Sequence, residues 1–185
     1  MRYFLTRRHP AAARILLVES GSRDIVEGIL PGLRATYGDD VPIDLVTCYP
    51  GLPSSLDSAS TRVYRVTDYR TGAARAQLYR ELAANNYTIT GIVCCAVPIM
   101  TKWKWSLALR LPAKVFVLNE NGDTFWLDIG HLGIVRHFVL FRAGLAGAGA
   151  VRTLARAFLF PVTLLYLLLY AATVHSKRAL RRGHS

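Results

Sequence analysis

Side chains that could bind an anion come directly after the first apolar run of the chain. Ser20, Gly21, Ser22 and Arg23 stand where a helical pattern begins. The free backbone amides at a helix N-terminus attract a phosphate or a carboxylate, and Arg23 would add positive charge. A structural explanation also holds, because Ser22 is a good N-cap and Asp24 is favourable in a first turn. The segment therefore has two interpretations, an anion site or a capped helix.

A second polar segment, residues 101–105, alternates cations with large aromatic side chains at the start of another helical pattern. Thr101, Lys102 and Lys104 could contact the same anion as the first segment. Indole rings favour the headgroup region of a bilayer, so Trp103 and Trp105 could instead hold the protein against a membrane. Packing of one indole in the core is a third interpretation, and the sequence does not choose among the three.

The third polar segment, residues 119–123, contains carboxylates that suit general base catalysis or metal binding. We include Asn119 and Glu120 among the candidate binding residues. An Asn-Gly turn that closes a hairpin explains the same residues without chemistry. His131 and His137 lack the i, i+4 spacing of a helical metal pair, so no metal site is predicted.

Cofactors are not predicted either. The chain contains neither the GxGxxG pattern of dinucleotide-binding folds nor the GxxxxGK[ST] pattern of P-loop proteins. Cys48, Cys94 and Cys95 lack metal-ligand spacing and fit a reducing compartment. We interpret Cys94 and Cys95 as buried small residues.

Five short apolar runs must position these segments. The runs are residues 14–19, 43–48, 62–66, 89–94 and 114–118, and helical patterns follow Ser22 and cover 73–85 and 100–110. This alternation predicts an α/β fold, a Rossmann-like parallel sheet of about five strands in the order 3-2-1-4-5 with helices on both faces. A ligand crevice is expected at the carboxyl ends of strands 1 and 4, where the first two polar segments would meet.

Residues 157–174 carry no charge and are long enough to cross a bilayer. As a helix they would extend about 27 Å, close to the ~30 Å of a hydrocarbon core. We therefore predict a transmembrane helix at 157–176, after a basic interfacial helix or connector at 129–156 and before a basic tail at 177–185. The residues expected to contact the membrane are Trp103, Trp105, Arg152, Arg156, Tyr166, Tyr170, Lys177 and Arg178.

Two features of this region leave its arrangement open. Pro161 either occupies the first turn of the helix or kinks it into a monotopic hairpin, and positive charge flanks both ends, so orientation is not determined. The small residues of 144–150 suit close packing against the membrane helix or against a second copy of the chain, although a flexible connector explains them too.

Charge divides the chain in the same place as hydropathy. The net charge is +11, all twelve Asp and Glu residues lie at or before Asp128, and the last 57 residues carry +8. A basic, acid-free region beside an apolar helix suits an anionic leaflet, which argues for membrane lipid as a partner and against nucleic acid. No apolar stretch at the start of the chain predicts export, so we expect a basic arm at 1–13 and a cytoplasmic domain at 14–128 on the inner membrane.

Residues 14–48, RILLVESGSRDIVEGILPGLRATYGDDVPIDLVTC, resemble the first βαβ unit of the heptosyltransferase-like glycosyltransferases of family 9. The resemblance continues loosely from Tyr79 to Leu118. It implies a Rossmann-like fold that faces a lipid-linked acceptor, with Asp24 at the position of the catalytic base and the Lys102 region at that of residues meeting acceptor phosphates. The family's second, donor-binding domain has no counterpart after Asp128.

Two functions follow as expectations. The first is a membrane-associated glycosyltransferase-like protein of envelope glycan or lipopolysaccharide assembly, with Asp24 as base and Arg23 and Lys102 holding an anionic, lipid-linked acceptor. A partner glycosyltransferase subunit would then supply the donor site. The second is a non-catalytic, membrane-anchored Rossmann-like module that binds a partner enzyme or an anionic lipid.

Overall fold

The computed structural model spans the chain and describes all residues except 1–2, 96, 98, 120–122, 146–149 and 183–185, and in the last helix it describes the side chains of 155–175 alone. The chain forms two compact units, Met1–Leu132 and Gly133–Ser185. The first unit contains both the predicted arm at 1–13 and the predicted domain at 14–128.

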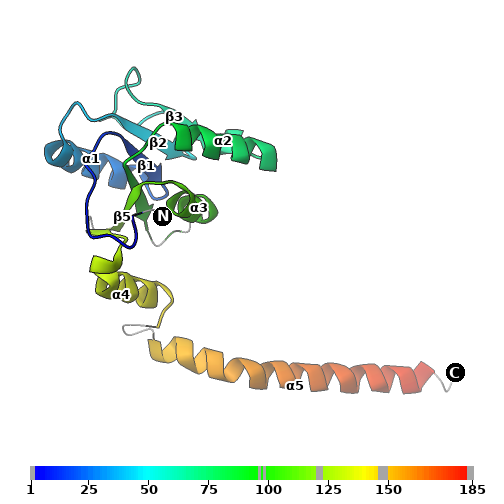
Figure 1. The fold of residues 1–185 in the computed structure, drawn as a ribbon. Helices are drawn as coiled ribbons and strands as arrows, with labels where there is room; N and C mark the ends of the chain where they lie inside the picture. Colours follow the sequence, from blue (N-terminus) through cyan, green and yellow to red (C-terminus); the bar gives the residue numbers. More distant parts are fainter. Residues whose placement is uncertain (1–2, 96, 98, 120–122, 146–149, 183–185) are drawn as a thin grey trace. The chain divides into compact units, whose positions relative to one another are not determined.

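The first unit is built on one sheet, as the alternating pattern predicts (Figure 1). Its parallel strands are β1 (Ile15–Glu19), β2 (Ile43–Thr47), β3 (Val63–Arg65), β4 (Ile89–Cys94) and β5 (Lys114–Asn119). The α/β class is confirmed, and these five strands stand in the predicted order within β3-β2-β1-β4-β5-β6. The sheet is larger than predicted and mixed, because β6 (Thr124–Trp126) pairs antiparallel with β5.

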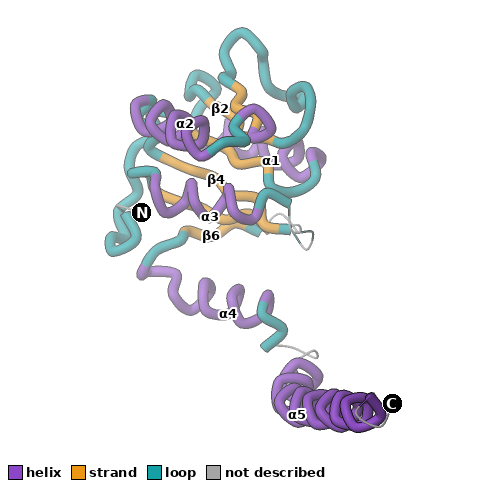
Figure 2. Tube along the Cα trace, turned by 90° about the vertical axis from the view of Figure 1, so that its right-hand side faces the viewer, coloured by secondary structure: helices purple, strands orange, loops and turns teal. Residues whose placement is uncertain are grey.

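Three helices cover the sheet unequally. The helix α1 (Arg23–Tyr37) lies on one face, whereas α2 (Gly72–Ala84) and α3 (Thr101–Arg110) lie on the other, in front of the strands in Figure 2. Right-handed crossovers explain this division, because the chain leaves β1 in one direction and returns past it in the other. Short 3₁₀ turns occur at Val66–Asp68 and Ile129–His131.

The face that carries α1 holds an apolar core. Val26 and Leu30 of α1 pack with residues of the four central strands, and Leu56 of the loop after β2 joins them. Gly91 of β4 is essential to this packing, since an added Cβ would lie 2.4 Å from Phe116 Cζ and 2.7 Å from Leu17 Cδ2. The ring of Phe116 therefore rests directly on the backbone of the neighbouring strand.

The amino-terminal end of the sheet is closed by a buried ion pair. Lys114 and Asp128 are both fully buried, and the Lys114 ammonium also donates to the carbonyl oxygens of Thr6 (2.7 Å) and Tyr3 (3.4 Å). Burial would raise the pKa of Asp128, but hydrogen bonds from Lys114 and His131 outweigh it and lower that pKa to about 2. The N-terminal arm is thereby fixed to the end of the domain.

The second unit is helical in the part that the structure describes. It contains α4 (Leu132–Arg142) and α5 (Ala150–Arg182), and no residue of α4 is buried. Within α5, Ala155–His175 has a mean hydropathy of 2.0 and is long and apolar enough to cross a membrane. The helix is longer than the predicted 157–176, and Pro161 lies inside it instead of in its first turn.

Candidate functional site

The first polar segment folds into an internal network at the carboxyl end of β1. Glu19 is fully buried, and the Arg23 guanidinium donates two hydrogen bonds to it, at 3.0 Å and 3.2 Å. The Thr47 hydroxyl donates to the same carboxylate, and Arg23 also donates to the carbonyl of Pro50 at 2.7 Å. An anion near Arg23 would therefore compete with a buried carboxylate that already neutralises it.

The remaining residues of this segment support the turn. Ser20 is buried and its hydroxyl donates to the carbonyl of Val93, while an added Cβ on Gly21 would lie 2.5 Å from Val93 Cγ1. Ser22 occupies the N-cap position of α1, but its side chain makes no capping hydrogen bond. The close approach of β4 at Val93 therefore explains why Ser20 and Gly21 occur in this turn. The side-chain capping role expected for Ser22 is absent.

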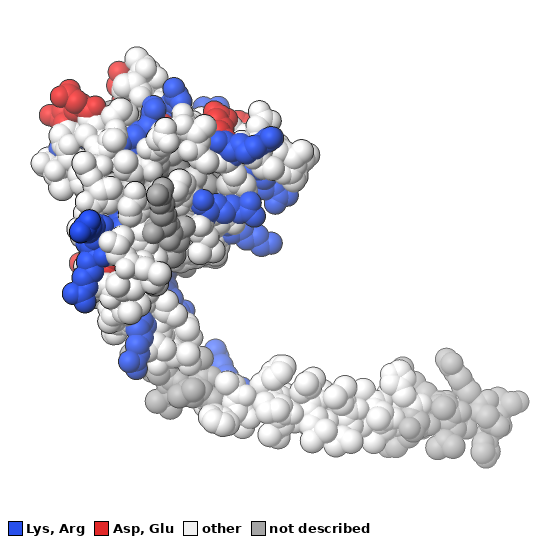
Figure 3. All heavy atoms as spheres, viewed as in Figure 1, with Lys and Arg blue, Asp and Glu red and all other residues white. Residues whose placement is uncertain are grey.

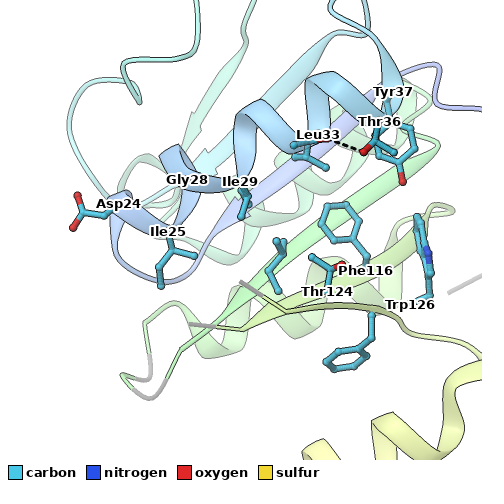
Figure 4. Close-up of a pocket in the computed structure, with 13 residues that line it drawn as sticks. Asp24, Ile25, Gly28, Ile29, Leu33, Thr36, Tyr37, Phe116, Thr124 and Trp126 are labelled. Atoms are coloured by element: carbon cyan, nitrogen blue, oxygen red, sulfur yellow. Dashed lines mark hydrogen bonds between the residues drawn. The ribbon is translucent and has the colours of Figure 1, made fainter. Parts of the chain in front are cut away.

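Asp24 differs from its neighbours because its carboxylate is exposed. Across the part of the chain that the structure describes, no hydrogen bond or ion pair reaches this side chain. It lies in the first turn of α1 and points away from the interior of the domain (Figure 4). Its geometry leaves the carboxylate available to solvent or to a ligand.

The second polar segment begins α3 and separates into outward and inward side chains. Thr101 and Lys102 are exposed, whereas Lys104 is buried. Trp103 contacts the ring of Tyr79 on α2 at 5.9 Å between centroids, and Trp105 is half-buried. Among the described contacts, none joins Lys102 or Lys104 to residues 20–24. The shared anion site predicted for the two segments is therefore not assembled by direct contact.

The described ends of the third segment, Asn119 and Asp123, lie next to each other where β5 and β6 pair. Asn119 donates to a carboxylate oxygen of Asp123 at 2.9 Å and accepts from the backbone amide of Asp123 at 2.9 Å. Glu120 lies outside the described residues, as do the side chains of Arg152, Lys177 and Arg178. The two ends of the segment thus form the antiparallel pair that the hairpin interpretation predicts.

The cysteines lie near these loops without forming a cluster. Cys94 is buried as predicted, but Cys95 is half-buried because β4 has ended at that point. The Cys95 thiol lies 3.6 Å from the carbonyl oxygen of Ser20, which brings the loops after β1 and β4 together. Cys48 is also half-buried, and this partial burial raises the pKa of its thiol.

A cavity of about 810 Å³ lies in the first unit between α1 and the β5–β6 edge of the sheet (Figure 4). Its wall is the row Ile25, Ile29 and Leu33 of α1, and Phe116 and Trp126 lie across from this row. Polar groups are few and stand at its margins: Asp24, Thr36, Tyr37 and Thr124. Among the lining residues that the structure describes, none is Lys or Arg, and Asp24 is the one charged residue.

Trp126 is fixed on several sides. Its ring centroid lies 4.6 Å from that of His9 and 5.7 Å from that of Phe116, and the Lys114 ammonium lies 5.9 Å from its centroid. The cavity therefore shares a rigid aromatic residue with the buried ion pair at the end of the sheet. At the margin of the cavity, burial raises the pKa of the Tyr37 phenol above its usual range, so this group, neutral at pH 7 in any case, stays a hydroxyl into more alkaline solution.

Sequence reasoning missed this cavity, although its wall was visible in the pattern. The period of Ile25, Ile29 and Leu33 indicates the inner side of a helix, and such residues are expected in a core. The signal that could have found the cavity is the pair Gly28 and Gly32 on the same helix, since both line it and an added Cβ on either would meet nothing within 4 Å.

Comparison with known proteins adds no family: no family model, curated protein or solved structure matches the chain.

Proposed function

We propose that the protein is a membrane-anchored Rossmann-like binding module that holds the apolar part of an amphiphilic molecule between α1 and the β5–β6 edge. The observation that carries this proposal is the 810 Å³ cavity with its apolar and aromatic lining. Small-molecule sites typically enclose roughly 300–1,000 Å³ and combine such a lining with a few polar groups.

The lining also bears on the chemistry of the ligand. Because the described part of the lining holds no cation, the cavity suits an apolar chain with an uncharged hydroxyl head, such as an isoprenoid or fatty alcohol, better than a phosphate. The hydroxyl groups of Thr36 and Tyr37 could bind that head at the margin. A molecule of this kind concentrates in bilayers, and the apolar helix at Ala155–His175 supports a location where it is abundant.

Photolabelling of the full-length protein in nanodiscs tests this function. The probe is a diazirine-bearing farnesol, and mass spectrometry locates the labelled residues. We expect saturable labelling on α1 and β5–β6 that unlabelled farnesol competes away. Gly32→Leu places a side chain in the cavity and should abolish this labelling, whereas Ala76→Leu, at an exposed position of α2 on the other face of the sheet, is the matched control and should retain it. Equal labelling of both variants would overturn the proposal.

A glycosyltransferase-like activity is the second candidate, supported by the exposed Asp24 at the edge of the same cavity. A lipid-linked acceptor would place its chain against α1, Asp24 would act as general base, and a partner subunit would supply the donor site. The assay is sugar transfer from nucleotide sugars to a hydroxyl group of a polyprenyl-linked sugar, whose proton Asp24 would accept, by native membranes that contain the protein. Loss of transfer in Asp24→Asn, with farnesol labelling retained, would support this candidate, and unchanged transfer would remove Asp24 from it.

A further inference from the structure

The two sides of the first unit carry opposite charge. Residues 62–110, which supply β3, α2 and α3, contain eight Lys and Arg but only two Asp and Glu. Residues 15–61, which supply α1 and the loop after β2, contain two Lys and Arg but seven Asp and Glu. Figure 3 shows blue atoms over the region of α2 and α3 and red atoms mainly over the side of α1. The unit is therefore electrically polar across its sheet.

The two basic helices form one continuous surface. The contact between Tyr79 and Trp103 joins them, and the Arg110 guanidinium stacks on the Tyr79 ring at 4.6 Å. The buried side chains of the two helices, which face the sheet, are Leu78, Leu82, Lys104, Leu107 and Ala108. Arg80, Lys102 and Arg110 are exposed, and Leu109 beside Arg110 is 61% exposed.

The cations of α2 and α3 form no ion pair within the described part of the chain. The ion pairs in the described part of the chain involve Arg14, Arg23, Lys114 and His131, and none involves a cation of α2 or α3. Cationic side chains that form no internal ion pair keep a positive electrostatic potential that attracts an external anion.

We propose that the surface formed by α2 and α3 binds the anionic headgroups of a lipid bilayer. This proposal rests on charge and not on the cavity, so it is independent of the proposed function. Each basic side chain near an anionic leaflet strengthens binding by roughly fivefold. Trp103 and Trp105 add indole rings, which favour the headgroup region, and Leu109 adds exposed apolar area.

The rest of the chain favours a membrane over a nucleic acid as this partner. The apolar helix at Ala155–His175 would tether the basic surface to a bilayer, and a tether raises the local concentration of its own target. Recognition of nucleic acid gains nothing from such a tether. Short duplex DNA therefore serves as the competitor in the test.

The experiment uses the full-length protein in nanodiscs of phosphatidylcholine, with or without phosphatidylglycerol. Lipids with a spin label next to the headgroup quench tryptophans that approach the surface. We expect stronger quenching in the anionic discs, falling with added salt because ions screen exposed charges. Arg80→Gln with Lys102→Gln should weaken docking by on the order of 30-fold, since two cations are removed.

The matched control is Ser55→Glu with Ser58→Glu, which changes net charge equally but lies in the loop on the side of α1. It should retain the quenching. Equal quenching in the two lipids, insensitivity to salt in the wild-type protein, or an equal loss in the control would overturn the proposal. Displacement from anionic discs by duplex DNA at matched phosphate concentration would also overturn it and assign the surface to nucleic acid.

Discussion

The two faces of the sheet are covered to different extents. On one face α2 and α3 bury Leu78, Leu82 and Leu107 completely. On the other face α1 is the one helix, and its row Ile25, Ile29 and Leu33 stays partly exposed above a cavity. The difference arises after β5, where the chain forms the antiparallel β6 instead of crossing back with a helix.

This contrast separates stability from binding. The face closed by two helices covers the apolar side chains that point from them to the sheet, so it contributes to holding the fold, as does the core beneath α1. A face with one helix leaves apolar surface that only another molecule can cover, so it is suited to bind. The same sheet therefore has one closed face and one face that combines a core with a candidate binding site, and each prediction below tests that contrast.

Truncation of one leucine on each face should give the largest difference. Leu107→Ala removes a fully buried side chain and should cost about 2–5 kcal/mol in the free energy of unfolding. Leu33→Ala removes a partly exposed side chain at an existing cavity and should cost about 1 kcal/mol. Urea denaturation of the full-length protein in nanodiscs measures both, and equal costs would break the comparison.

Gly91→Ala tests the position of the Phe116 ring, which lines the cavity and lies against Gly91. The new Cβ would overlap the ring of Phe116, so this ring or β4 must move. We expect a loss of about 1–3 kcal/mol, as for other overpacked cores, together with loss of farnesol labelling. A change in labelling without a change in stability would show that Phe116 moves freely and that the cavity is not preformed.

Acid should lower the stability of the protein by protonating Asp128, at the amino-terminal end of the sheet. The pKa of Asp128 is about 2 in the folded protein, below the ~3.9 of an unfolded aspartate. Its contribution is therefore complete above about pH 4 and is lost as the pH falls towards 2, by on the order of 2 kcal/mol. Unfolding measured from pH 5 to 2 should show this loss in the wild-type protein. Asp128→Asn should lack this part of the acid response.

Gly32→Leu should have the smallest effect, and of opposite sign. Gly32 is inside α1, and nothing lies within 4 Å of an added Cβ. Replacing a helical glycine stabilises by up to about 1 kcal/mol. On the closed face Ala108→Leu, at a fully buried position, should instead destabilise. Thermal unfolding measures the melting temperature of each variant. An equal decrease in the two melting temperatures would contradict the difference between the two faces.

Local patterns in the sequence predicted most of the fold. Apolar runs located the five parallel strands to within one or two residues, because strands buried on both faces need continuous apolar sequence. The period after Ser22 predicted α1, and the lack of charge in 157–174 predicted the apolar part of α5. Crossover handedness then fixed the order of the parallel strands.

The candidate site was harder to predict, because it depends on contacts between distant residues. Glu19 ends an apolar run, and nothing local indicates that Thr47 will donate to it or that it will engage Arg23. The sequence similarly indicates Lys114 only as a strand residue. Its ion pair with Asp128 depends on the folded structure, which places the two side chains next to each other. The cavity exists because β5 is followed by the antiparallel β6 and not by a helix that would cover this edge of the sheet. The periodicity of α1 carries no information about that connection.

The closure at the amino-terminal end has a mechanical consequence. The Ile129 amide donates to the Phe4 carbonyl at 3.0 Å, so a residue near the start of the first unit is hydrogen-bonded to one near its end. A pull on the chain beyond Leu132 would load this bond and the pair of Lys114 with Asp128 before it reached the parallel strands. The short antiparallel β6 would then detach from β5 one hydrogen bond at a time, sparing the sheet behind it and opening the cavity at Trp126.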